Sequence, residues 1–346
     1  MGYPEILGIL FIFFILFNKL LIKKKYFLDP SKNLDHKFFL NKGEDIPFSG
    51  GILVLISCLI FLSSEYNILK IFLLLIAIIG VLSDLEILKS PTKRIIFQTL
   101  IVSVFLIISE LFIDSVRIEF LDNFLKIYYF KLIFTAFCLL ILINGTNFLD
   151  GLNTLVTVYY IMVISIIFYL KYKFNFNFET EIIEITLLAL FIFLLFNFFG
   201  KAYLGDNGSY LVSFIIGIVL IEISKKNLFY VETSQYLSPY FIACLLWYPA
   251  YENLFSIIRK KLKNFGASNP DNKHLHQLLF IKLRKKLKYN NSILNTFTGI
   301  IINVYNFFVF FISVNNFSNT KILLLILIIN ILIYTILYFF LKKKNN

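Results

Sequence analysis

The chain has 346 residues, of which 59% are hydrophobic and only 16% are charged, and its formal net charge is +12. Soluble domains are about half apolar and carry more charge, so this composition excludes an ordinary soluble domain and indicates a polytopic membrane protein. The positive charge is spread beside apolar segments, so we expect a lipid bilayer as the partner and no nucleic acid.

Apolar segments follow one another from end to end of the chain. A spanning helix needs about 20 mostly apolar residues, and the segments lack the period-two alternation of membrane strands. We therefore predict an all-α fold with about eleven (ten or eleven) transmembrane helices. The segments cover residues 4–22, 48–64, 69–83, 95–113, 127–143, 154–170, 183–199, 208–224, 238–256, 293–314 and 320–341.

Basic residues predict how these segments are oriented. Most of the 33 Lys and Arg follow odd-numbered segments or lie in the C-terminal tail, and cytoplasmic loops carry such an excess. We therefore expect the N-terminus outside and the C-terminus in the cytoplasm. No linker or repeat divides the chain, which predicts a single domain over 1–346, with 257–292 as a cytoplasmic loop that contains histidines.

Each predicted cytoplasmic loop carries a compact polar cluster with glycine nearby. Polar groups at membrane depth are costly and usually face a shared interior, so we expect these loops to converge on one cytoplasmic site. Carboxylates beside phosphate-binding cations suit Mg²⁺ and a diphosphate. The clusters are DIPFSGG (45–51), VLSDLEILKSPTKR (81–94), NGTNFLDGLN (144–153), GKAYLGDNGSY (200–210) and RKKLKNFGASNPDNKHLHQLL (259–279).

Four motifs resemble one family, in the expected order and over about residues 29–280. Residues 144–151 (NGTNFLDG) look like its N-A-x-N-x-x-D-G, and 204–209 (LGDNGS) contain its G-D-x-G-S. Residues 274–277 (HLHQ) look like its histidine loop, and Pro47 with Gly50 and Gly51 looks like its P-x-x-G-G. The chain therefore resembles the polyprenyl-phosphate N-acetylhexosamine-1-phosphate transferases of glycosyltransferase family 4.

The resemblance implies a reaction and its partners. Polyprenyl phosphate, typically undecaprenyl phosphate, attacks the β-phosphorus of a UDP-N-acetylhexosamine, and UMP leaves, which initiates a cell-envelope glycan at the bacterial inner membrane. The implied cofactor is Mg²⁺, with Mn²⁺ as a substitute. Three alternatives stay open: a transporter or flippase for an anionic solute, a noncatalytic membrane scaffold, and the peptidoglycan phospho-MurNAc-pentapeptide transferase. The oligomeric state is not predicted.

Ten residues have expected roles, eight from positions that match the family and two, Lys93 and Arg94, because basic residues beside the carboxylates suit a diphosphate. Asp206 and Asn147 are the expected metal ligands, although an aspartate at a helix start is also a common N-cap and a lone asparagine is usually a turn amide. Asp150 and Asn153 lie three apart, so on a helical turn they would share a face. The expected catalytic residues are Asp84, Asp150, His274 and His276, and the expected substrate-binding residues are Asn144, Asn153, Lys93 and Arg94.

The chain departs from the family at Ser83-Asp84, where the family usually has two adjacent aspartates. Serine is no general base at neutral pH, so either Asp84 suffices, the first carboxylate is dispensable, or the chain is inactive. A phosphate monoester is already largely ionised near pH 7, because its second pKa is about 6, which favours direct displacement. Lys93 and Arg94 could equally be membrane anchors, and His36 has no assigned role. The expected sugars are GlcNAc, GalNAc or a deoxy-N-acetylhexosamine.

Overall fold

The computed structural model describes residues 2–29, 45–174, 178–225, 237–262, 273–287 and 289–345. Within these ranges the chain is helical, and the only β feature is an isolated antiparallel bridge between Leu28 and Pro47. The all-α prediction is confirmed. His36 lies outside the described residues, as do positions 263–272 and 288 of the predicted histidine-containing loop.

Fourteen α-helices and one short 3-10 helix make up the described chain. They are α1 (Tyr3–Lys24), α2 (Gly50–Phe61), η3 (Ser64–Tyr66), α3 (Asn67–Asp84), α4 (Pro91–Ser109), α5 (Glu119–Leu125), α6 (Tyr128–Leu149), α7 (Leu155–Phe174), α8 (Glu181–Phe198), α9 (Gly205–Lys225), α10 (Pro239–Leu245), α11 (Trp247–Leu262), α12 (Leu275–Lys286), α13 (Asn291–Val314) and α14 (Thr320–Asn345).

All eleven predicted apolar segments are helical, but two of them are not simple spans. In the described part of the chain, nine helices are long and apolar enough to cross a membrane, and α10 with α11 forms a tenth candidate that is bent by 75°. The apolar helix α2 has only 12 residues. The chain is therefore a multi-pass membrane protein, while the number of spans and the orientation of the termini stay predictions.

The bend in segment 238–256 has a physical cause at Pro249. Proline has no amide hydrogen, so a continuous helix would leave the carbonyl of Leu245, four residues earlier, without its usual partner. Instead a new helix begins at Trp247, which places Pro249 in its first turn, where proline is tolerated. The hydroxyl of Tyr159 donates to the Leu245 carbonyl at 2.7 Å, so the freed acceptor is satisfied.

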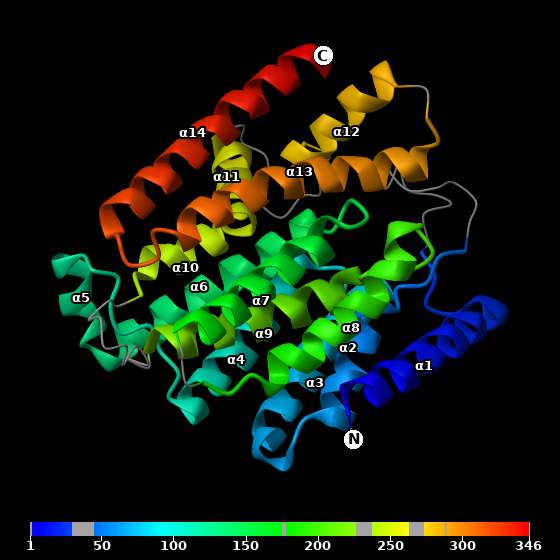
Figure 1. Ribbon diagram of the computed structural model, residues 1–346, viewed down its shortest axis with the longest axis horizontal. Helices are drawn as coiled ribbons and strands as arrows, with labels where there is room; N and C mark the ends of the chain where they lie inside the picture. The colour runs from blue at the N-terminus through cyan, green and yellow to red at the C-terminus, as the bar shows by residue number, and fades with distance from the viewer. Residues whose placement is uncertain are drawn as a thin grey trace.

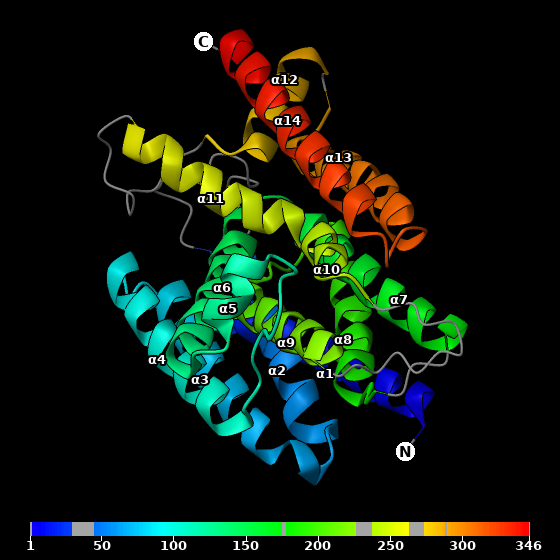
Figure 2. The same ribbon diagram turned by 90° about the vertical axis from the view of Figure 1, so that its left-hand side faces the viewer.

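Helix α9 is the centre of the bundle. Its apolar stretch is 89% buried, far more than that of any other candidate span in the described chain, and it packs against α2, α3 and α6 (Figure 1). The C-terminal helices α12, α13 and α14 lie together on one side, and α1 lies on the opposite side (Figure 2). A helix buried on every face holds its N-terminus firmly, and that end carries the G-D-x-G-S motif.

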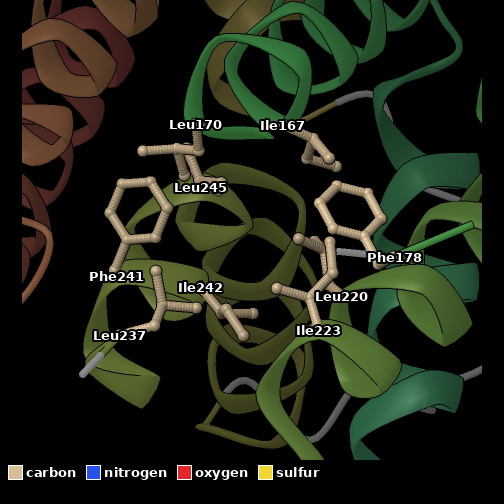
Figure 3. A pocket seen from close by; sticks show the side chains of 9 residues that line it. All are labelled: Ile167, Leu170, Phe178, Leu220, Ile223, Leu237, Phe241, Ile242 and Leu245. Atoms are coloured by element: carbon tan, nitrogen blue, oxygen red, sulfur yellow. The ribbon is translucent and has the colours of Figure 1, made fainter. Parts of the chain in front are cut away.

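A small cavity lies towards the other end of α9. Nine hydrophobic side chains line it, among them Ile167 and Leu170 of α7, Leu220 and Ile223 of α9, and Phe241 of α10 (Figure 3). Leu220 lies 14 residues beyond Asp206, or about 21 Å along the helix. The cavity offers no polar side chain for a nucleotide or an ion, whereas the polar G-D-x-G-S motif lies at the N-terminal end of α9, and the candidate site is described from there.

Candidate active site

The predicted loops do meet at the N-terminal end of α9. The Tyr203 amide donates to the Pro47 carbonyl at 2.9 Å, and the amides of Gly50 and Gly51 donate to the carbonyls of Tyr203 and Leu204 at 3.0 and 3.2 Å. Gly205 then turns the chain into α9 with φ +77°, a left-handed conformation that favours glycine. These bonds pair the 45–51 loop with the 200–210 loop and set the position of Asp206.

Two glycines let neighbouring helices reach the backbone of α9. A Cβ on Gly51 of α2 would lie 2.2 Å from the Gly208 nitrogen, and a Cβ on Gly80 of α3 would lie 2.2 Å from the Asn207 Cα. Both distances are far below van der Waals contact, and backbone atoms cannot rotate away. Only glycine therefore allows α2 and α3 to approach this closely.

Asp84, at the end of α3, caps the N-terminus of α9. Its Oδ1 accepts from the Asp206 amide at 2.8 Å, and its Oδ2 accepts from the Asn207 amide at 3.1 Å and from Asn207 Nδ2 at 2.6 Å. The first amides of a helix have no partner within it and favour an anion. The contacts thus give Asp84 a positioning role at the site, while its predicted catalytic role stays a prediction.

The Asp206 side chain is the centre of a polar group that we call the aspartate cluster: Ser83, Asp84, Arg94, Asn147 and Asp206. Oδ2 of Asp206 accepts from Ser83 Oγ at 2.5 Å and from Arg94 Nη1 at 2.7 Å, and Arg94 Nη1 also donates to Ser83 Oγ at 2.6 Å. Oδ1 accepts from Asn147 Nδ2 at 2.7 Å. The side chains of Arg94 and Asp206 are 22% and 26% exposed, so the ion pair lies at the edge of the protein interior.

Arg94 and Lys93, which the sequence treats as a pair, separate in the structure. Ser90 caps α4 by accepting from the Lys93 amide at 3.4 Å, and Pro91 occupies the first helical position. This start places Arg94 in the aspartate cluster, whereas the Lys93 side chain is exposed. The side-chain amide of Asn144 donates to Gln98 of α4 at 3.0 Å, so its described contact is with α4 and its predicted role in substrate binding stays a prediction.

A second group, which we call the histidine cluster, consists of four polar side chains and the ring of Phe148 that packs against them. The polar residues are Glu252, His274, His276 and Tyr334. The centroid of the His274 ring lies 5.1 Å from that of Phe148 and 5.7 Å from that of His276. His274 Nδ1 lies 2.8 Å from Oε1 of Glu252. Phe148 follows Asn147 directly, so the last turn of α6 belongs to both clusters.

His276 is fully buried, and neither of its ring nitrogens has a hydrogen-bond partner among the described residues. Burial lowers the pKa of His276 to about 3, and the negative Glu252 opposes this shift only in part. The imidazole is therefore neutral at physiological pH. It lies beside Gly151, where a Cβ would come within 3.0 Å of its Nε2, so the histidine loop touches the 144–153 loop as expected.

The expectation that Asp150 and Asn153 share a helical face is wrong. Helix α6 ends at Leu149, because the loop has to turn into α7 at Leu155. Asn153 is 5% exposed, and its backbone amide donates to Asn295 Oδ1 at 2.6 Å, while its side chain donates to Thr296 Oγ1 at 3.4 Å. The structure thus ties Asn153 to α13, whereas Asp150 is half-buried at the end of α6.

Two participants were not predicted from the sequence. Ser83 appeared only as a missing aspartate, yet it bridges Arg94 and Asp206. Glu252 lies inside the apolar segment 238–256 and carries no predicted role, although an ionisable residue within such a segment is itself a sign of function. No three His, Cys, Asp or Glu side chains come together as a metal-binding group within the described ranges.

Comparison with known proteins agrees with these motifs. The family model described as glycosyl transferase family 4 matches residues 66–224, which include the whole aspartate cluster. A Bacillus subtilis (strain 168) protein described as a probable undecaprenyl-phosphate N-acetylglucosaminyl 1-phosphate transferase is 23% identical over 242 residues. That match covers 68% of this chain and 65% of the relative, slightly less than two thirds of its length. The resemblance predicted from the motifs is thus confirmed for residues 66–224, which match the model of glycosyl transferase family 4.

Proposed function

We propose that the protein transfers an N-acetylhexosamine 1-phosphate from a UDP-sugar to polyprenyl phosphate and releases UMP. The family match and the name of the relative support this reaction. The observation that carries the proposal is the aspartate cluster, in which three separate polar segments bring the Asn147 amide and the Arg94 guanidinium within hydrogen-bond distance of the Asp206 carboxylate. Such a group suits a reaction between two phosphate-bearing substrates.

Phosphoryl transfer needs mainly positioning and charge neutralisation. An oxygen of the lipid phosphate forms a bond to the β-phosphorus of the donor, and the bond from that phosphorus to the oxygen of UMP breaks. We assign Arg94 to a phosphate group of one substrate, because a guanidinium matches phosphate geometry. Ser83 holds the guanidinium in place and needs no basic function, since the lipid phosphate is already largely ionised.

The oxygen-bearing side chains of the aspartate cluster also fit Mg²⁺ as ligands. This ion uses one or two carboxylates and takes its other ligands from water and substrate phosphates. Asp84 is bound by the amides of α9, so Asp206 with Asn147 is the pair that fits the ion. When bound, Mg²⁺ would neutralise the charge of the donor diphosphate. We further propose that the protein lies in the bacterial inner membrane, with this site on the cytoplasmic side.

The test is release of UMP by purified protein. Undecaprenyl phosphate, Mg²⁺ and a panel of UDP-sugars, with UDP-GlcNAc, UDP-GalNAc and UDP-MurNAc-pentapeptide among them, would be compared with reactions that contain EDTA or lack the lipid. We expect UMP that depends on lipid and metal, and the best donor would name the sugar. Arg94→Gln should abolish most of the release, whereas Lys89→Gln, at an exposed position beside Glu86, should not.

Folded protein that releases no UMP from any donor would refute the proposal. Vesicle uptake of an anionic solute by that same protein would favour the transporter alternative. Release from UDP-MurNAc-pentapeptide alone would move the protein to the peptidoglycan branch.

A further inference from the structure

Glu252 is a carboxylate inside a membrane-protein bundle, and both of its oxygens are engaged. The side chain is 1% exposed. Oε1 lies 2.8 Å from Nδ1 of His274, and Oε2 accepts from the Tyr334 hydroxyl at 2.7 Å. Three elements therefore meet at this carboxylate: α11 supplies it, the start of α12 supplies His274, and α14 supplies Tyr334.

A buried carboxylate is costly unless it has close partners, so packing alone does not account for a glutamate here. A carboxylate on one ring nitrogen of histidine fixes the ring orientation and selects the tautomer that has its proton on that nitrogen. Since Nδ1 of His274 is committed to Glu252, any hydrogen bond or proton exchanged with a substrate has to pass through Nε2.

Further contacts hold both the backbone and the ring of His274. Its backbone amide donates to Oε1 of Gln277 at 3.1 Å, which fixes the first turn of α12. The ring lies against Phe148 and His276, and Phe148 is next to Asn147 of the aspartate cluster. The orientation that Glu252 imposes on His274 is thus an orientation relative to the proposed phosphate site.

We propose that Glu252 is a positioning residue that fixes the tautomer and orientation of His274, and that α14 completes this arrangement through Tyr334. The effect on turnover rests on the proposed function, but the effect on the His274 ring does not. The proposal gives the C-terminal helix, which lies outside the matched residues 66–224, a part in the active site.

The chain offers a direct probe because it has only three histidines. Protein labelled with ¹⁵N-histidine, in detergent micelles, would be compared as wild type, Glu252→Gln, Tyr334→Phe and Tyr251→Phe, with His274→Gln to assign the signals. Tyr251→Phe is the matched control: its hydroxyl shares a 2.8 Å hydrogen bond with Thr335, so the variant removes a tyrosine contact between α11 and α14 without touching Glu252.

We expect Glu252→Gln to move both ring ¹⁵N signals of His274 and to lower the rate of UMP release by about ten- to a hundredfold, the range found when a metal-ligating histidine loses the carboxylate that orients it. Tyr334→Phe should move the same signals less and cost roughly three- to tenfold, as one hydrogen bond is lost. Tyr251→Phe should leave the His274 signals in place and the rate within about twofold, because the hydroxyl that it removes bonds Thr335, whereas the aromatic ring that packs against Tyr334 is kept.

Unchanged His274 signals in Glu252→Gln, or full activity in that variant, would overturn the proposal. If Glu252→Gln does not fold, the His274 ¹⁵N signals and the rate of UMP release of Tyr334→Phe test the proposal in its place. Wild-type protein that releases no UMP would refute the proposed function, and the ¹⁵N comparison would still decide the role of Glu252.

Discussion

Substituting Ser83 by aspartate tests whether this site is built around Arg94. Ser83 Oγ lies 2.5 Å from Asp206 Oδ2 and 2.6 Å from Arg94 Nη1. A carboxylate at position 83 would place two negative charges about 4 Å apart, a repulsion of about 4 kcal/mol at the effective dielectric constant of a partly exposed site. Arg94 would contact both carboxylates, and its attraction to the new one would offset a repulsion of that size. With Arg94 present, we therefore expect Ser83→Asp to cost only about 1 kcal/mol, for the lost hydroxyl hydrogen bond.

Without Arg94 the repulsion is not offset. Ser83→Asp in an Arg94→Gln background should cost about 2 to 4 kcal/mol, after allowance for solvent at side chains that are roughly one-quarter exposed. Unfolding of the wild type, both single variants and the double variant in detergent with EDTA would give the coupling energy. Ser83→Ala is the control for loss of the hydroxyl alone.

The same variants are then compared with Mg²⁺ added, for their stability and their rate of UMP release. A second carboxylate should strengthen Mg²⁺ binding, so adding Mg²⁺ should stabilise Ser83→Asp more than the wild type, and Ser83→Asp should keep or raise the rate of UMP release. An equal cost of Ser83→Asp with and without Arg94 would refute the electrostatic reasoning. A folded Ser83→Asp protein that has lost most of its activity in Mg²⁺ would show that the serine itself is required.

Three further predictions concern other parts of the site. Asp206→Asn should lower UMP release by at least about a hundredfold while the protein stays folded in detergent, and retained activity would remove the metal assignment. Gly51→Ala should cost about 2 to 4 kcal/mol of stability, because its Cβ would collide with α9. Gly8→Ala, where no atom lies within 4 Å, should be neutral or stabilising, and a similar loss in both variants would contradict the packing argument. Finally, the pKa of about 3 for His276 means that the unfolded chain, where histidine titrates near 6.5, takes up a proton that the folded protein does not. Stability should therefore fall by up to about 1.4 kcal/mol per pH unit as the pH drops below about 6.5. His276→Phe should remove this dependence between pH 7 and 5, and an unchanged slope would show that other groups cause it.

The positions of the helices were predictable because the length of an apolar segment nearly decides its structure in a membrane. The prediction that each apolar segment forms one continuous spanning helix was wrong for two segments. Segment 238–256 breaks at Leu246, for which Pro249 was a readable signal, and segment 48–64 gives only a 12-residue helix. Helices α5 and α12 lie outside the predicted apolar segments, where hydrophobicity alone gives no sign of them.

The meeting of the motifs was predictable, but their contacts were not. Loops on one side of a bundle can converge, and those of the 47–51, 144–151 and 204–209 motifs do. Which atoms meet depends on helix packing: Asp84 reaches the amides of residues more than a hundred positions later only because Gly51 and Gly80 let α2 and α3 touch α9. Spacing within a motif carries no information about such distances.

Asn153 and Glu252 show how chemistry and burial together decide a role. Asn153 belongs to a polar motif, and its predicted role in substrate binding stays a prediction; in the structure its backbone and side-chain amides donate to α13. Glu252 lies in an apolar segment and carries no predicted role, but it contacts the histidine of a motif. An amide in a turn has many possible partners, so its presence says little. A carboxylate in an apolar helix is costly to bury without a cation or several donors, so its partner is the feature to look for. In this chain that partner is His274, and the same reasoning applies to any acid within a predicted span.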